Sequence, residues 1–381
     1  MTYFDKKWEY YASRDSEKKR PLCFVAAEDN CTVQLNAKEG APSVSLEYSL
    51  DNQTYNTYAI GTAISLPHTG NKIYFKGSNT TFGTGQNDND AGCHNFALGG
   101  KMFARGNIMS LVDPTCASLQ IPGNGCFRRM FWGNKTLLTP PVMPATRLKN
   151  ACYSAMYYGC SSLLFAPTLP SMDVPYNAYN MAFRGSGISI PPRLPATSIE
   201  GGAYYRLFNE CPNLLYCPEL PATTLPSVSA YGYMCSACTS LRHGPSVLPA
   251  VTSLSGGHYQ YMFSGCSSMK EFPVIMAENF VAASCFTFMF NGCTKATGIV
   301  ELFMTQMGGD RYLNGMFRGC KSISGLKVHF TNWTNGYDNV TGNWFDNSAE
   351  IGTFMCPTEL DTDTITRGPN TIPSGWTISK Y

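Results

Sequence analysis

The side chains in this chain that could carry chemistry are mostly cysteines. Sixteen are present, and Cys235 and Cys238 form a C-x-x-C. Two thiols at that spacing can form a redox pair or supply half of a zinc site. The sequence contains no second C-x-x-C to complete four ligands, and Cys238 also belongs to a repeat. We therefore interpret both residues as structural.

A second candidate is the neighbouring pair Cys93 and His94, which follows a glycine-rich loop. A histidine can activate a cysteine nucleophile, but no catalytic signature surrounds this pair. Within the loop, residues 87–90 offer oxygen ligands to calcium, yet they lack the glycine and the distal glutamate of an EF-hand. The remaining histidines have no metal-binding spacing: His68, His243, His258 and His329. We expect no catalytic, cofactor or metal site, and a non-enzymatic protein.

Many of the cysteines occupy one position of a repeat whose clearest copies read MFxGC. Copies start 25 to 28 residues apart, at Met130, Met156, Ala182, Leu207, Met234, Met262, Met289 and Met316, with a degraded copy at Trp344. The fifth position carries Cys160, Cys211, Cys238, Cys266, Cys293 and Cys320, and elsewhere Asn134 and Ser186. These residues share a small size, which predicts buried packing positions and thiols outside any disulfide bond.

Aromatic side chains recur in register with the motif. Three residues before each start lie Phe127, Tyr153, Tyr179, Tyr204, Tyr231, Tyr259, Phe286 and Leu313. The second motif position carries Phe131, Tyr157, Phe183, Phe208, Cys235, Phe263, Phe290 and Phe317. One repeat cannot bury such a face alone, so neighbouring repeats must stack into a solenoid.

The local structure of one repeat is predicted from its spacing. Residues 176–184 have apolar side chains three to four positions apart, which indicates a short helix or helical turn before the Gly-Cys pair. Proline-rich segments follow most copies, as in PPVMPAT from Pro140 and PELPATT from Pro218. Proline fixes the backbone and removes a donor, so we expect these segments to be extended connectors.

The pattern MFxGCxSL followed by xxxPxLPAT resembles the BspA-like class of leucine-rich repeats over about residues 126–350. The match is best at residues 156–170, 207–223 and 262–273, and it weakens after Met289, where the LPAT segment is lost. The resemblance implies a β-rich fold with a solenoid of about eight or nine rungs, which we assign to residues 101–350.

Different sequences flank the repeats. Short alternating runs within residues 22–100 predict a small antiparallel β-sandwich, and LEYSLDNQTYNTYAIG resembles the immunoglobulin-like module that often precedes this repeat class. Residues 103–112 are expected to cap the first rung, and residues 1–21 form a charged arm. Residues 351–381 resemble a C-terminal cap in which Trp376 closes the apolar end.

Composition excludes several classes of function. The 28 basic residues nearly balance 26 acidic ones, and only 14% of residues are charged. A partner recognised through phosphates, such as nucleic acid, would require a basic excess. The sequence contains no run of about 18 apolar residues, so it predicts no membrane-spanning helix. The first twenty residues lack the apolar core of a secretory signal.

Three hypotheses of function follow. The first is a bacteriophage virion component, of fibre, decoration or receptor-binding type, that presents a rigid repeat surface to a host glycan or protein. It fits a chain that starts with Met and carries no secretion signal, reduced thiols and a charged arm that could bind other virion proteins. The second is a bacterial cell-surface adhesin, which the resemblance implies. The third is a carbohydrate-active or glycan-binding protein. For the first we expect a homo-oligomer.

Overall fold

The structure is a computed structural model, and it describes residues 14–84, 91–222, 225, 229–249, 256–276, 283–306, 309–333 and 340–381. Residues 87–90, whose oxygen ligands are not expected to form a calcium site, and the start of the charged arm lie outside them. The chain divides into two compact units, Met1–Ile188 and Ser189–Tyr381. The first repeats therefore belong to the same unit as the N-terminal strands, and the division does not coincide with the predicted domain boundaries.

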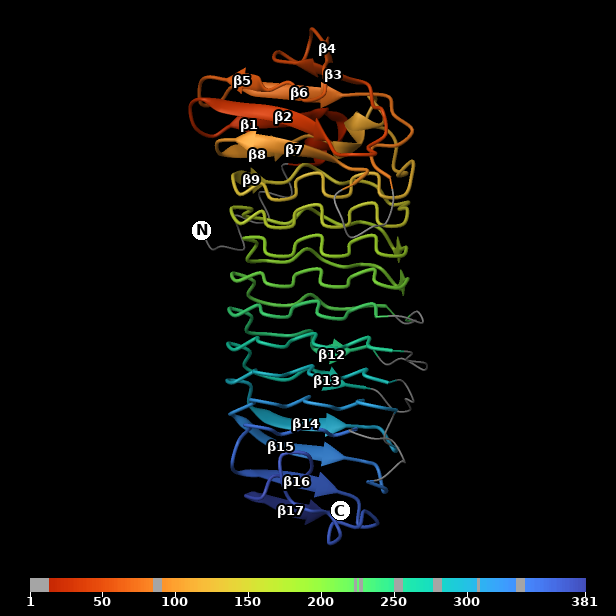
Figure 1. The fold of residues 1–381 in the computed structure, drawn as a ribbon, viewed down its shortest axis with the longest axis vertical. Coiled ribbons are helices and arrows are strands. Elements are labelled where there is room, and N and C mark those ends of the chain that lie inside the picture. Colours follow the sequence, from red (N-terminus) through yellow and green to blue (C-terminus); the bar gives the residue numbers. More distant parts are fainter. Residues whose placement is uncertain are drawn as a thin grey trace. The chain divides into compact units, whose positions relative to one another are not determined.

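The described secondary structure is almost entirely short strands and turns (Figure 1). Unit 1 contains η1 (Asp15–Lys19), β1 (Leu22–Ala26), β2 (Cys31–Ala37), β3 (Leu46–Ser49), β4 (Asn56–Tyr58), β5 (Ile64–Leu66), β6 (Lys72–Lys76), β7 (His94–Gly99), β8 (Met102–Arg105), η2 (Ile108–Leu111), β9 (Leu137–Thr139) and β10 (Asp173–Val174). Unit 2 contains β11 (Ser198–Ile199), β12 (Val247–Leu248), β13 (Val274–Ile275), β14 (Gly298–Leu302), β15 (Ile323–Val328), β16 (Gly352–Cys356) and β17 (Trp376–Lys380).

The N-terminal strands of unit 1 form two sheets, in the orders β4-β3-β6-β1-β8-β9 and β5-β2-β7. The rings of Phe24 on β1 and Phe96 on β7 lie 4.8 Å apart and are fully buried, so the two sheets share a core. β8 pairs in parallel with β9, where Phe103 opposes Thr139. Since β9 belongs to the first repeat, the sheet continues directly into the repeats.

Unit 2 is a parallel β-solenoid in which each of β12 to β17 comes from a successive repeat. Figure 1 shows β14 to β17 side by side at the blue end of the chain. The strands are in register, so that Val300, Leu326, Phe354 and Ile378 form one row across the sheet. The predicted β-rich solenoid is therefore confirmed.

The segments that contain the motif are ribbons of consecutive turns. Along residues 151–159 of unit 1, alternate amides donate to the carbonyl three residues back, as Met156 N does to Tyr153 O at 3.2 Å. The intervening amides donate to the next rung, as Tyr157 N does to Ala182 O at 2.8 Å. Residues 257–265 of unit 2 repeat this scheme. In this way the ribbon satisfies its own backbone and also joins the rungs.

The helix predicted at residues 176–184 is wrong. Its backbone takes a positive φ at every fourth residue, Asn177, Met181 and Gly185, which a right-handed helix cannot do. A four-residue period still places side chains four apart on the same face. Because that spacing is close to the helical period of 3.6 residues, the apolar pattern alone does not separate the two structures.

The predicted aromatic columns are confirmed inside each unit. In unit 1, Phe127 stacks on Tyr153 and Tyr153 on Tyr179, with centroids 5.9 and 5.7 Å apart and planes within 15°. In unit 2, the ring of Tyr259 lies 5.9 Å from that of Tyr231 and 5.7 Å from that of Phe286. These rings are buried and nearly parallel, so each rung covers the apolar face of its neighbour.

Candidate functional site

The repeat cysteines lie in the interior, and their thiols contact backbone carbonyls of a preceding rung. Cys266 Sγ is 3.0 Å from the carbonyl of Cys235 in the preceding rung, and Cys293 Sγ is 3.2 Å from that of Phe263. All sixteen cysteines belong to the described residues, and all are buried thiols outside any disulfide bond. This confirms the predicted state of the thiols and adds a weak S–H···O bond between rungs.

The C-x-x-C pair is part of this packing. Cys235 and Cys238 are both fully buried, and Cys238 Sγ donates to Phe208 O at 3.0 Å. Burial raises the pKa of both thiols well above the usual value, which disfavours the thiolate needed for redox chemistry or metal binding. Within the described ranges, no group of three or more His, Cys, Asp or Glu could hold a metal ion.

Cys93 and His94 are neighbours in sequence but have separate contacts. Cys93 Sγ donates to Ala91 O at 3.7 Å, whereas His94 Nδ1 lies 2.8 Å from Phe82 O, to which it donates. Burial lowers the pKa of His94 and favours the neutral ring. The ring packs 4.9 Å from that of Phe82. The pair is thus arranged as part of the core of unit 1.

Two of the remaining histidines contact acids on adjacent rungs of unit 2. His243 Nδ1 is 2.8 Å from Glu271, and His329 Nε2 is 2.8 Å from Glu301. Glu301 also pairs with Lys327 at 2.8 Å. These side chains are partly or largely exposed. These contacts could not be predicted from sequence, because the partners are about 28 residues apart and meet only when rungs stack.

Unit 2 carries a second, half-buried row of side chains at one repeat position, which we call the outer ladder: Arg206, Tyr233, Tyr261 and Phe288. The ring of Tyr261 is 4.6 Å from that of Tyr233 and 5.1 Å from that of Phe288, with planes within 19°. The guanidinium of Arg206 lies over Tyr233, 4.8 Å from the ring centroid. The three aromatic residues occupy one position of successive turn ribbons, each with positive φ.

The repeat register places the outer ladder along one side of unit 2. Desolvation raises the pKa of the Tyr233 and Tyr261 hydroxyls, so both rings remain neutral at physiological pH. This row was not predicted from the sequence, because it lies outside the motif and its first member is an arginine. A count of the aromatic residues directly before each motif start would have found it.

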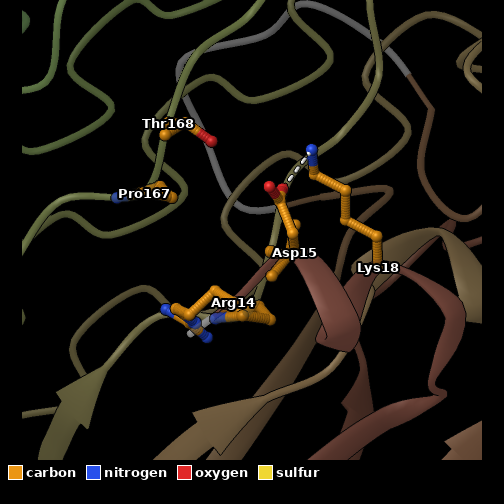
Figure 2. A pocket seen from close by; sticks show the side chains of 7 residues that line it. Arg14, Asp15, Lys18, Pro167 and Thr168 are labelled. Atoms are coloured by element: carbon orange, nitrogen blue, oxygen red, sulfur yellow. Dashed lines mark ion pairs between the residues drawn. The ribbon is translucent and has the colours of Figure 1, made fainter. Parts of the chain in front are cut away.

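Unit 1 contains a small pocket of about 80 Å³ between η1 and the first proline-rich segments. Figure 2 shows Asp15 and Lys18 beside Pro167 and Thr168, with the Asp15–Lys18 ion pair at 2.7 Å drawn as a dashed line. Both charged side chains of that pair are largely exposed. A pocket of this size takes one small group, well below the several hundred Å³ of a typical ligand site.

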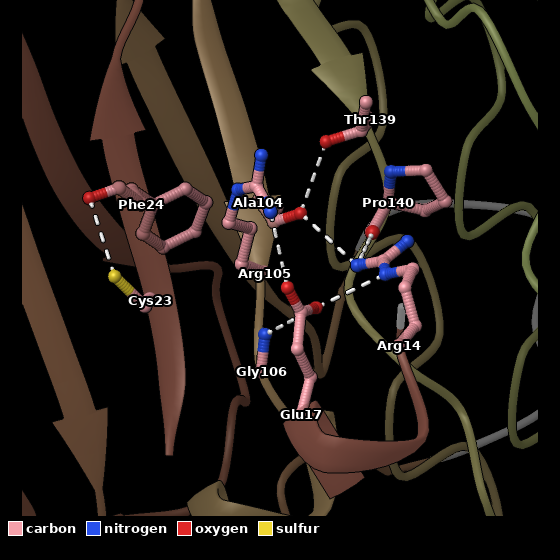
Figure 3. A network of polar contacts seen from close by, with 9 residues as sticks. All are labelled: Arg14, Glu17, Cys23, Phe24, Ala104, Arg105, Gly106, Thr139 and Pro140. Carbon is pink, nitrogen blue, oxygen red and sulfur yellow. Dashed lines mark hydrogen bonds and ion pairs between the residues drawn. The ribbon is translucent and has the colours of Figure 1, made fainter. Parts of the chain in front are cut away.

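Beside this pocket, the end of the charged N-terminal segment is built into unit 1. Arg14 and Glu17 are both 8% exposed and form an ion pair at 3.0 Å. Arg14 Nη2 also donates to Pro140 O at 2.6 Å (Figure 3). Asn107 Nδ2 donates to Lys18 O at 2.7 Å. A buried charge is tolerated when it is paired and hydrogen-bonded in this way. Residues 14–20 thus fasten the strands to the first repeat.

None of the helices among the described residues is long and apolar enough to cross a bilayer. Comparisons with family models, with curated proteins and with solved structures each found no match to this chain.

Proposed function

We propose that this protein is a non-enzymatic recognition component that presents the side of its repeats to a glycan or protein. The outer ladder carries the proposal. Tyr233 and Tyr261 offer rigid contact area at low conformational cost, and Arg206 adds a cation that lies over the Tyr233 ring. Tyr and Arg are also enriched among the residues that dominate binding energy. A partner that contacts several rungs at once would gain affinity from each.

The setting we propose is a bacteriophage particle, where the protein would act as a fibre, decoration or receptor-binding component in a symmetric homo-oligomer. Sixteen buried thiols outside disulfides suit folding in a reducing compartment such as the cytoplasm in which particles assemble. The repeats would then be leucine-rich repeats of the BspA-like class, preceded by an immunoglobulin-like module. That class resemblance also supports the alternative, a bacterial cell-surface adhesin.

Peptide mass spectrometry tests the setting on two fractions from cells that express the gene: density-purified phage particles and the washed cell surface. Recovery in stoichiometric amounts with the particles supports the virion component. Recovery only from the cell surface supports the adhesin instead. Recovery from neither fraction contradicts both settings.

Binding to host surfaces tests the role of the outer ladder. We expect the double variant Tyr233→Ala and Tyr261→Ala to bind intact host cells at least tenfold more weakly, since removing two contact residues of about 1 kcal/mol or more each exceeds the 1.4 kcal/mol of a tenfold change. The matched control is Tyr176→Ala in unit 1, which removes a tyrosine that is 39% exposed and outside the ladder. Equal binding by the ladder and control variants contradicts the proposed surface.

A further inference from the structure

Unit 1 has a hollow of about 120 Å³ on the outer face of its six-stranded sheet, and the repeats do not contribute to it. We call it the basic hollow; its lining includes Glu17, Arg20, Cys23, Lys72, Tyr74 and Arg105. Cys23 on β1 lies directly between Tyr74 on β6 and Arg105 on β8. Its neighbours Leu22 and Phe24 point into the core, so the Cys23 side chain is the floor of the hollow.

Positive charge dominates the lining. Arg20, Lys72 and Arg105 stand against one carboxylate, that of Glu17. Figure 3 shows how that carboxylate is already used: Oε1 accepts from Arg105 Nη1 at 3.1 Å, and Oε2 accepts from Arg14 Nε at 3.0 Å and from Gly106 N at 3.3 Å. The buried Arg14, which does not line the hollow, therefore also offsets the negative charge of Glu17.

The remaining cations have donors to spare. Arg105 uses only Nη1 on Glu17, which leaves the rest of its planar guanidinium available. In the described part of the chain, neither Arg20 nor Lys72 is within ion-pair distance of an acidic side chain. Both side chains are exposed at the rim. The hollow thus carries an uncompensated positive charge of about two units.

The floor adds no negative charge. Burial raises the pKa of the Cys23 thiol to about 12, and burial also raises the pKa of Tyr74. Both groups are therefore neutral at physiological pH, and together with Val25 they give the hollow a partly apolar base. An anion bound here would meet cations at the rim and an uncharged floor below.

We infer that the basic hollow binds an oxyanion, the carboxylate or phosphate group of a larger ligand. A guanidinium fork pairs with a carboxylate or a phosphate through two hydrogen bonds, and a lysine supplies a mobile third charge. The volume suits a single charged group, while the exposed rim leaves the rest of the ligand in solvent. The site goes beyond the proposed function because it lies outside the outer ladder and needs no repeat surface.

Calorimetric titration of the full chain tests the site with sodium glucuronate, methyl glucoside and inorganic phosphate as probes. We expect glucuronate to bind and the neutral glucoside not to bind. Arg20→Gln and Lys72→Met should each weaken glucuronate binding about tenfold, because each removes a charge-assisted hydrogen bond. Lys72→Arg, which keeps the charge, should restore most of the affinity.

The matched control is Lys101→Met, which removes an exposed lysine of the same unit that lies 4.0 Å from Glu28 and outside the hollow. It should bind glucuronate like the original chain. Because Arg20 and Lys72 are exposed, thermal unfolding of their variants should be unchanged, which separates lost binding from lost folding. Phosphate binding that is tighter than glucuronate binding and equally sensitive to Lys72→Met supports the oxyanion site with phosphate as its source. No binding of either anion, or binding unaffected by Arg20→Gln and Lys72→Met, overturns the inference.

Discussion

At the scale of single residues, the repeat cysteine combines small size with a hydrogen-bond donor. Its thiol reaches a carbonyl of the preceding rung, as in Cys266 to Cys235 and Cys320 to Phe290. Where Asn134 takes the position, its amide donates to Phe131 O at 3.1 Å and to Phe96 O at 2.6 Å. The position therefore selects a small donor, and the sequence alone predicted only the small size.

The same burial predicts the reactivity of the thiols. Burial raises the pKa of Cys152, Cys285 and Cys320 to about 12, so the reactive thiolate is scarce at pH 8. We expect a thiol reagent to react very slowly with the native protein. After denaturation without a reductant, it should react with all sixteen thiols. A count well below sixteen would show disulfides and contradict the buried thiols.

The contacts of Glu301 predict how stability depends on pH. Its hydrogen bond with Lys327 lowers the pKa of Glu301 and raises that of Lys327. The lowered pKa adds stability above about pH 4.3, which is lost as the pH falls through the folded-state value. The raised pKa adds stability below about pH 10.4, which is lost as the pH rises through the folded-state value.

Urea midpoints measured from pH 2 to pH 12 test this pair. We expect Glu301→Gln to lower the midpoint near pH 7 slightly, because both groups are partly exposed, and to reduce the loss of stability at both ends of the range. Glu359→Gln serves as the control, since the described contact of Glu359 is with Thr358 alone. An unchanged pH profile in Glu301→Gln would show that the pair contributes nothing.

At the scale of elements, the turn ribbon explains why glycine follows the aromatic part of the motif. Gly133, Gly159 and Gly185 each have positive φ, and a Cβ built on Gly159 would lie 3.8 Å from the Cα of Gly133. There is room for a side chain, but the left-handed backbone opposes it. Gly187 is different, because a Cβ there would lie 2.1 Å from the carbonyl oxygen of Ser161.

These two glycines give a matched prediction within one unit. Gly159→Ala should destabilise unit 1 by about 1 kcal/mol, through backbone conformation alone. Gly187→Ala should cost more, because the two rungs must move apart to relieve the clash. Chemical denaturation of both variants checks the order. A larger cost for Gly159→Ala would contradict the close approach at Gly187.

The sequence predicts these elements where a repeat period places equivalent residues together, and fails where residues distant in sequence meet. The columns through Tyr153 and Tyr259 were predictable, because a fixed period places equivalent residues above one another. The prediction of a helix at residues 176–184 was wrong, because turn ribbons and helices share a spacing of about four residues between side chains on one face. The basic hollow was not predictable, since Cys23, Tyr74 and Arg105 come from strands about 30 to 80 residues apart in sequence.

At the scale of the whole molecule, stacking makes the repeats of unit 2 nearly one-dimensional. In unit 2 each rung of the parallel sheet bonds mainly to the rungs before and after it, as β15 does to β14 and β16. An end rung has one neighbour, so its exposed face needs separate protection. Trp376 on β17 gives this protection: it is 2% exposed, donates to Ala349 O at 3.0 Å and packs 4.8 Å from the ring of Phe345.

Removing this side chain should therefore loosen one end of unit 2. We expect Trp376→Ala to cost about 3 to 5 kcal/mol locally, the usual range for truncating a buried tryptophan. Hydrogen exchange should accelerate strongly in β16 and β17 and much less in β12 and β13, because local opening spreads from the end through nearest neighbours. Ile351→Ala, at a side chain that is 81% exposed, is the control and should leave exchange unchanged. Equal acceleration in all strands would mean that unit 2 unfolds as one cooperative block, and that the stability of a rung does not depend mainly on its neighbours.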